Sequence, residues 1–216
     1  MSNTPLVIDQ KVMKEQFIAI RYMFGAGGNF MDAWLTASKL NLSNIVLNEY
    51  GSAHSAYKEF LPFRLPLTKT PTPSTNSRRH PPYFSHTEYR DLSIISSMFY
   101  KVINMSYELD DCDELELCFL GKLFFESVDK FPSVYVRHHE ARQKYYEPIE
   151  STNTILNVTW KELLHGDADA LIERLKMFTG LTNIKKEYLL EWREKTKLGM
   201  IKTENKIVKN KDLITL

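Results

Sequence analysis

Cysteine and long apolar runs are both scarce in this chain of 216 residues. The two cysteines, Cys112 and Cys118, are too far apart for a CxxC pair and have no neighbouring histidine, so we expect no zinc site. Two cysteines cannot form a disulfide framework, which favours a reducing compartment. No stretch approaches the roughly 18 apolar residues of a membrane span. The first 14 residues lack the apolar segment of a secretory signal, and we therefore expect a cytoplasmic protein.

An excess of charge of either sign is also missing. Lys and Arg number 28 against 27 Asp and Glu, and the formal net charge is +1. This balance gives no reason to expect a nucleic acid or a membrane surface as a partner. The hydrophobic share of 43% is ample for a core, and the length fits a single domain over residues 1–216. Residues 1–16 are expected to form an N-terminal arm. The oligomeric state stays open.

Glycine is infrequent, yet three of the eight glycines fall within Gly25–Gly28. The apolar run 17–20 predicts a buried strand before them, and apolar residues at helical spacing up to Ser38 predict a helix after them. Asn29 is a good N-cap, and Asp32 suits the positive end of that helix. Bare backbone N–H groups at such a turn suit a phosphate or a sulfate. The alternative is a tight turn whose glycines only permit close packing.

Strands and helices alternate along the rest of the chain. The expected strands are 43–48, 101–107 and 155–159; the expected helices are 86–98, one that opens with the acidic residues Asp110, Asp111, Asp113 and Glu114, then 160–165, 168–178 and 185–198. Asp167 can cap the helix at 168, and Gly180 can end it. This alternation indicates an α/β fold of three layers, with a mainly parallel sheet flanked by helices.

Three strand ends are expected to meet at one edge of this sheet. They carry the glycine turn, Tyr107–Asp111 and Trp160. Ligands of parallel α/β sheets bind beyond the carboxyl ends of the strands, so this edge is the expected binding crevice.

Two stretches outside these elements carry positive charge. Residues 62–82 hold six of the nine prolines and end in Arg78, Arg79 and His80, which predicts a loop that is either a basic flap over an anion or a solvated surface segment. The basic C-terminal tail, 199–216, either touches a polyanion or is solvated. His138, His139 and Glu140 do not have the spacing of a metal site, and we expect no metal.

The order of these pieces resembles the sulfotransferase family, whose fold is a P-loop-like α/β sheet. The resemblance rests on the strand–glycine turn–helix at 17–38, on KVINMSYELDD at 101–111, on NVTWKELLHGDADALIERLKMFTGL at 157–181, and on the position of His80. The chain also looks like small P-loop proteins of this kind found in marine phage and metagenomic sequence.

The resemblance implies transfer of a sulfuryl group from 3′-phosphoadenosine 5′-phosphosulfate to a hydroxyl or amine of a small molecule or glycan. It assigns the cofactor to the following residues: Gly25, Ala26, Gly27, Gly28, Asn29, Phe30 and Tyr107. It makes His80 the expected general base, with His54 and His86 as alternatives.

Two departures from the family pattern keep other functions open. The family's loop carries a lysine followed by Ser or Thr, where this chain has Ala26 to Asn29, and the family's 3′-phosphate arginine is here Tyr107. Charge could instead come from one of four arginines, Arg21, Arg78, Arg79 or Arg137. The alternatives are a non-catalytic protein that binds an anion, nucleotide or glycan on the same scaffold, and a P-loop phosphotransferase.

Overall fold

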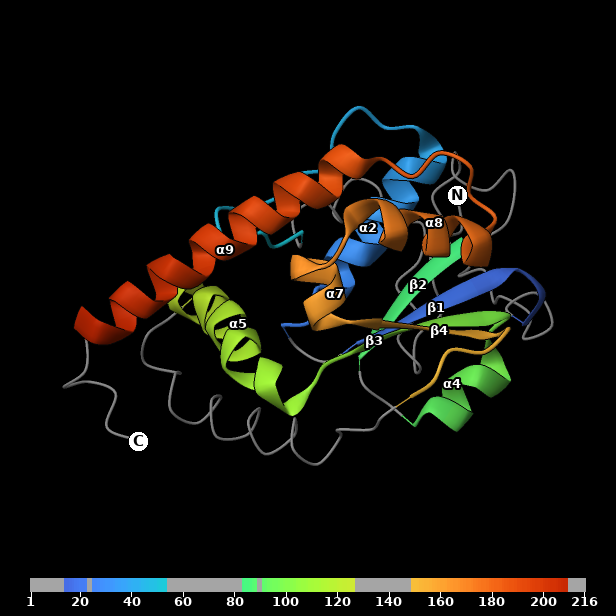
Figure 1. Cartoon of the computed structure of the whole chain (residues 1–216), viewed down its shortest axis with the longest axis horizontal. Helices are drawn as coiled ribbons and strands as arrows, with labels where there is room; N and C mark the ends of the chain where they lie inside the picture. The colour runs from blue at the N-terminus through green and yellow to red at the C-terminus, as the bar shows by residue number, and fades with distance from the viewer. Residues whose placement is uncertain (1–13, 23–24, 54–82, 89–90, 127–148, 210–216) are drawn as a thin grey trace, which may run out of the picture.

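The protein is built on a four-stranded, fully parallel sheet in the order β2-β1-β3-β4 (Figure 1). The computed structural model describes residues 14–22, 25–53, 83–88, 91–126 and 149–209. The strands are β1 (Phe17–Tyr22), β2 (Tyr83–Glu88), β3 (Lys101–Ser106) and β4 (Ile155–Thr159). The helices are α2 (Gly28–Leu40), α4 (Leu92–Met98), the 3-10 turn η1 (Leu109–Asp111), α5 (Cys112–Glu126), α7 (Trp160–His165), α8 (Ala168–Thr179) and α9 (Lys186–Lys209).

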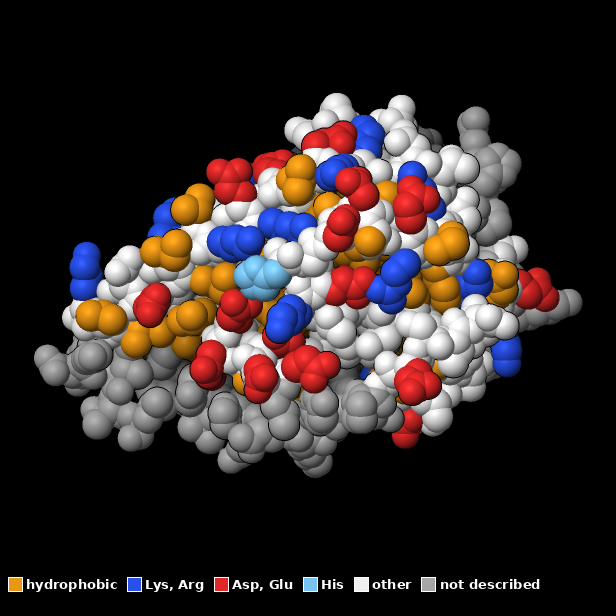
Figure 2. All heavy atoms as spheres, in the orientation of Figure 1, with side chains coloured by type: hydrophobic (Ala, Val, Ile, Leu, Met, Phe, Trp, Pro, Cys, Tyr) orange, Lys and Arg blue, Asp and Glu red, His pale blue; other side chains and the backbone are white. Residues whose placement is uncertain are grey.

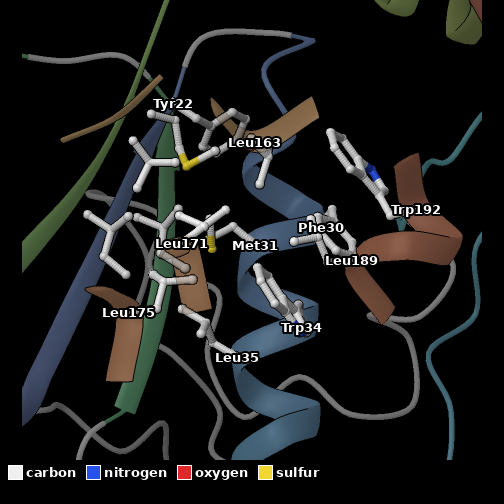
Figure 3. Packing of buried hydrophobic residues seen from close by; sticks show 14 of the residues in the cluster. Tyr22, Phe30, Met31, Trp34, Leu35, Leu163, Leu171, Leu175, Leu189 and Trp192 are labelled. Carbon is white, nitrogen blue, oxygen red and sulfur yellow. The ribbon is translucent and has the colours of Figure 1, made fainter. Parts of the chain in front are cut away.

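The central strand β1 is buried on both faces, as its apolar run predicts. Ile18, Ile20 and Tyr22 point into the larger core, beneath α2, α7, α8 and α9. Figure 3 shows Met31 and Leu35 of α2 facing Leu171 and Leu175 of α8 within that core. The side chains of β1 that alternate with these three point to the other face of the sheet and enter a second core.

The second core lies under α4. Phe17 and Ala19 of β1 pack there with Val102 of β3 and with Ile95 and Phe99. Helices therefore cover both faces of a parallel sheet, and the predicted three-layer α/β architecture is confirmed.

The ends of α7 and α8 follow the capping signals in the sequence. The Thr159 hydroxyl accepts a hydrogen bond from the Glu162 N–H at 3.1 Å. Asp167 Oδ1 accepts from the N–H groups of Asp169 at 2.8 Å and Ala170 at 3.0 Å, and these bonds lower the pKa of the Asp167 carboxyl. Gly180 ends α8 with a φ of 76°, a left-handed conformation that favours glycine.

Two predicted elements are wrong. Residues 43–48 form no strand; Ile45 and Leu47 anchor an irregular segment in the core, while Val46 is 50% exposed. The predicted helix 86–98 begins only at Leu92, because Tyr83–Glu88 instead pairs with β1 as an edge strand. Sheet pairing outweighs local helical spacing there.

The C-terminal helix is longer than its pattern indicates. It runs from Lys186 to Lys209, so residues 199–209 of the predicted tail are helical. The sequence pattern does not indicate this continuation, because the region is highly charged and contains Gly199. Packing of α9 against α5 stabilises the additional turns.

A row of polar side chains crosses the α4 face of the sheet in register. Arg21 Nη1 donates to Asn104 Oδ1 at 2.6 Å, and Asn104 Nδ2 donates to Asn157 Oδ1 at 2.8 Å. Arg21 is 1% exposed and Asn104 is fully buried. A buried guanidinium depends on such acceptors.

Several predicted features lie outside the described residues. They are the larger part of the N-terminal arm, the proline-rich loop 62–82, the cluster His138, His139 and Glu140, and the last residues of the tail. In the described part of the chain, no helix combines the length and hydropathy needed to cross a bilayer.

Replacing Asn104 tests the polar row. We expect Asn104→Ala to lower the free energy of unfolding by about 2 kcal/mol or more, because Arg21 loses a buried acceptor. Chemical denaturation of the variant measures this. Asn157→Ala, at the partly exposed end of the row, is the matched control and should cost less. Equal losses at both sites would contradict the assignment.

Candidate functional site

The order of the strands changes direction between β1 and β3. From β1 the chain goes to β2 on one side and then crosses back to β3 on the other. This change of direction is the position where parallel α/β sheets bind ligands. The turn Gly25–Gly27 and the start of α2 lie directly at it.

The glycine turn enters α2 through two left-handed residues. Gly25 has a φ of 90° and Gly27 a φ of 78°, and between them Ala26 is fully buried. Gly27, and not Asn29, occupies the N-cap position, and no side chain caps the helix. The predicted N-cap is therefore wrong: the backbone needs positive φ at that position, which glycine supplies without strain.

Asn29 and Asp32 do not have the positions at the start of α2 that the sequence predicts. Asn29 is a buried residue of the first turn, and its Oδ1 accepts from the Tyr22 hydroxyl at 3.3 Å. Asp32 lies beyond the first turn and accepts from the Thr36 hydroxyl at 3.2 Å. The N-terminal end of α2 therefore has its positive partial charge, and no carboxylate lies in the first turn.

Close packing also requires these glycines. A Cβ on Gly28 would lie 2.0 Å from Cγ of Tyr22. A Cβ on Gly27 would lie 3.0 Å from Leu163 Cδ2 and 3.1 Å from Trp192 Cζ2. Figure 3 shows Leu163, Trp192 and Phe30 around this end of α2. Close packing therefore explains why positions 27 and 28 are glycines, as the alternative prediction states. The backbone of the first turn of α2 lies at the wall of a hollow.

That hollow opens to solvent, and its interior volume is about 30 Å³, roughly the space of one water molecule. Its walls come from the start of α2, from the segment after the irregular 43–48 stretch, from α5 and from α9. The lining residues are Tyr22, Gly25, Gly27, Gly28, Asn29, Phe30, Tyr50, Gly51, Ser52, Ala53, Cys118, Trp192 and Thr196.

A tight turn at 48–52 supplies one wall. Asn48 Oδ1 accepts from the N–H groups of Tyr50 at 2.9 Å and Ser52 at 2.8 Å. Gly51 adopts a φ of 72°, and a Cβ there would lie 2.2 Å from the Thr196 hydroxyl oxygen. The backbone of the turn and α9 are therefore in close contact, which brings Ser52 and Thr196 to the wall of the same hollow.

These two hydroxyls are the most informative groups of the site. Ser52 is 6% and Thr196 3% exposed, and neither hydroxyl oxygen has a hydrogen-bond partner within the described structure. A buried hydroxyl without a partner costs about 1–3 kcal/mol. Both residues line the hollow at the start of α2, so their hydroxyls are candidate polar contacts for a ligand there.

The described lining contains no ionised side chain. Donors are hydroxyls and the N–H groups that the first turn of any helix leaves without a partner in the helix. Positive charge lies next to the lining: Lys206 Nζ donates to the Tyr50 hydroxyl at 2.7 Å, and Lys202 lies 5.9 Å from the centre of the Tyr50 ring. Part of the predicted basic tail thus packs beside the site.

The predicted site residues divide into two groups. Gly25, Gly27, Gly28, Asn29 and Phe30 line the hollow. Ala26 and Tyr107 are buried in the core and do not line it.

The predicted charged groups contribute little within the described structure. Arg21 lies on the opposite face of the sheet, bonded to Asn104, so it is not the cation of this hollow. His80, His54, Arg78, Arg79 and Arg137 are outside the described residues, as is the side chain of His86 on β2.

Four lining residues carry no signal in the sequence that marks them as part of a site: Ser52, Cys118, Trp192 and Thr196. Thr196 lies among charged residues of α9, and only the close approach of Gly51 buries it. Both cysteines are free thiols, and no three potential metal ligands gather in the described part of the chain.

A histidine with a carboxylate partner lies elsewhere at the same edge of the sheet. His165 Nε2 is 3.0 Å from Glu114 Oε2, and Trp160 Nε1 donates to the same oxygen at 3.1 Å. The carboxylate orients the imidazole, as it does for general bases. His165 does not line the hollow, however, and the two side chains form a partly exposed contact at the surface.

No family model matches the chain, and no curated protein matches it. Functional inference therefore rests on the site itself and on the resemblance of the sequence pattern.

Replacing Thr196 separates ligand binding from folding. We expect Thr196→Val to raise the free energy of unfolding of the ligand-free protein by about 1 kcal/mol, because it removes a buried hydroxyl without a partner at constant shape. Thr203→Val is the matched control on α9: Thr203 is equally buried, but its hydroxyl donates to the Gly199 carbonyl at 2.8 Å.

The control should lose stability where Thr196→Val gains it. Thermal and chemical denaturation of both variants make the comparison. If the two substitutions destabilise the protein equally, the Thr196 hydroxyl is satisfied in the native state and the argument for a ligand fails.

Proposed function

We propose that this protein is a sulfotransferase-like enzyme, which binds 3′-phosphoadenosine 5′-phosphosulfate and transfers its sulfuryl group to a hydroxyl or amine acceptor. The observation that carries the binding part is the hollow at the start of α2, with the hydroxyls of Ser52 and Thr196 buried beside it. The sulfuryl-transfer part rests on the resemblance of 17–38, 101–111 and 157–181 to the sulfotransferase pattern.

The residues of the hollow fit an oxyanion. Oxygens of a sulfuryl or phosphoryl group would accept from the first-turn N–H groups of α2 and from the two hydroxyls. In transfer, the bond from sulfur to the bridging oxygen breaks while a bond from sulfur to the acceptor forms, and the acceptor proton goes to a base. Donors fixed before the reaction stabilise the negative charge that develops on the leaving oxygen. Lys206 and Lys202, both beside Tyr50, are described cations adjacent to this lining.

The general base stays a prediction. His80, with His54 and His86 as alternatives, lies where the structure describes no side chain. The acceptor, a small molecule or a glycan, is likewise a proposal, and no metal ion is required by the described residues.

A second candidate function is binding without turnover. The described lining is neutral, and Ala26 takes the position of the family's loop lysine. A protein with these features would hold a nucleotide or a sulfated glycan by its anionic group and release it unchanged.

Ligand-induced stabilisation tests the binding proposal. We expect 3′-phosphoadenosine 5′-phosphate at millimolar concentration to raise the melting temperature, since saturation at 100 times Kd contributes about 2.7 kcal/mol. AMP, which lacks the 3′-phosphate, is the matched ligand control and should stabilise less. Thr196→Val should weaken the binding about tenfold. An unchanged melting temperature with every anion tested would refute the assignment of the hollow.

Turnover distinguishes the two candidate functions. Incubation with donor labelled in the sulfuryl group and a panel of hydroxyl and amine acceptors should give labelled product if the protein is an enzyme. Binding of the donor with no labelled product from any acceptor would favour the binding protein. The outcome of this assay leaves the thermal-shift result intact, so the two claims are tested separately.

A further inference from the structure

Cys118 brings a thiol to the described lining of the hollow. It lies in α5, is half-buried and forms no disulfide. Helix α5 packs against α9 (Figure 1), and Cys118 shares the lining with Thr196 of α9 and with the start of α2. The proposed sulfuryl transfer gives this thiol no role, although a thiolate is a strong nucleophile.

Two buried hydroxyls belong to the same lining. Ser52 and Thr196 are 6% and 3% exposed, and neither hydroxyl oxygen has a hydrogen-bond partner within the described structure. The Thr196 hydroxyl oxygen lies beside Gly51, which also lines the hollow. Each hydroxyl can donate a hydrogen bond to an oxygen atom that enters the hollow.

The size and the charge of the hollow limit the reagents that suit the thiol. The interior volume of about 30 Å³ is roughly the space of one water molecule, and the hollow opens to solvent. Side chains of both charges are interspersed over the visible outer face of the molecule (Figure 2), whereas the described lining has no ionised side chain. A small, neutral and polar reagent fits these properties, and hydrogen peroxide is one.

We propose that Cys118 is a site of oxidation by hydrogen peroxide, which converts its thiol to a sulfenic acid within the hollow. The thiol gives its proton to solvent, and the thiolate sulfur attacks one peroxide oxygen. The O–O bond breaks as the S–O bond forms, and the other oxygen leaves as hydroxide, which takes up a proton to become water. Sulfur is oxidised and the peroxide is reduced. The oxygen on sulfur then gives the hydroxyls of Ser52 and Thr196 an acceptor.

Oxidation of Cys118 closes the hollow to other ligands. One added oxygen occupies an interior that has room for about one water molecule, so an anionic group no longer reaches the start of α2. This consequence rests on the proposed binding function, whereas the oxidation itself does not.

Mass spectrometry of peptides from the peroxide-treated full chain tests the oxidation. We expect one oxygen atom to be added to Cys118 severalfold faster than to Cys112. Cys112 is the matched control, because it is a half-buried cysteine of the same helix outside the lining. Each cysteine has a helix N-terminus nearby, Cys112 that of α5 and Cys118 that of α2, so a difference in rate reports on the hollow. Equal rates, or faster oxidation of Cys112, overturn the proposal.

Removing one hydroxyl tests its part in the oxidation. Thr196→Val should lower the yield of oxidised Cys118 about fivefold, because the oxygen on sulfur loses a hydrogen-bond donor. Thr203→Val is the control, at an equally buried threonine of α9 outside the lining, and should leave the yield unchanged. Circular dichroism checks that both variants are folded, and Ser52→Ala serves if Thr196→Val is not. An unchanged yield without the hydroxyl contradicts the proposal.

The effect on binding is measured separately with 3′-phosphoadenosine 5′-phosphate. Complete oxidation of Cys118 should weaken binding to the wild-type protein about tenfold, which is about 1.4 kcal/mol. Cys118→Ala should keep its own affinity after the same treatment. Wild-type protein that binds equally well before and after oxidation overturns the closure of the hollow. Untreated protein that does not bind refutes the proposed function instead, and the oxidation is still decided by mass spectrometry.

Discussion

The close contact between the first turn of α2 and the ring of Tyr22 is the constraint on which the structure of the site depends. Gly28 has no room for even one additional carbon against that ring, and Gly27 is held from the other side by Leu163 and Trp192. The turn is therefore clamped between β1 below and α7 and α9 above. A clamped turn keeps its N–H groups in one arrangement, which is what a preformed anion site needs. Close packing at these glycines is therefore compatible with the proposed anion site, because the packing would hold the N–H groups in place.

Helix α9 closes the site from above. Its first half stacks Trp192 on Phe30, Thr196 in its middle lines the hollow, and its later turns bring Lys206 to the Tyr50 hydroxyl. Glycines at 51 and 199 permit the approach, since a Cβ at either would meet α9 or Tyr50 within 2.8 Å. The neutral lining and the nearby lysines fit the proposed anion site, in which hydrogen-bond donors would make most of the contacts and the positive charge lies at the margin.

The architecture was predictable because its signals are local or periodic. The apolar run of β1, the caps at Thr159 and Asp167, and the stop at Gly180 all act within a few residues. The predictions fail where tertiary contacts decide: 86–88 is an edge strand because β1 offers it partners, and α9 continues through Gly199 because α5 packs on it. Half of the site depends on such tertiary contacts. The glycine turn is visible in the sequence, whereas Ser52 and Thr196 meet across 144 residues through a single left-handed glycine, and no periodicity encodes that contact.

A crystal structure grown with 3′-phosphoadenosine 5′-phosphate tests the central claim most directly. The account predicts an anionic group of the ligand in the hollow, within hydrogen-bond distance of the Thr196 and Ser52 hydroxyls and of the first-turn N–H groups of α2. A hollow that holds only water, with the ligand bound elsewhere or not at all, would contradict it.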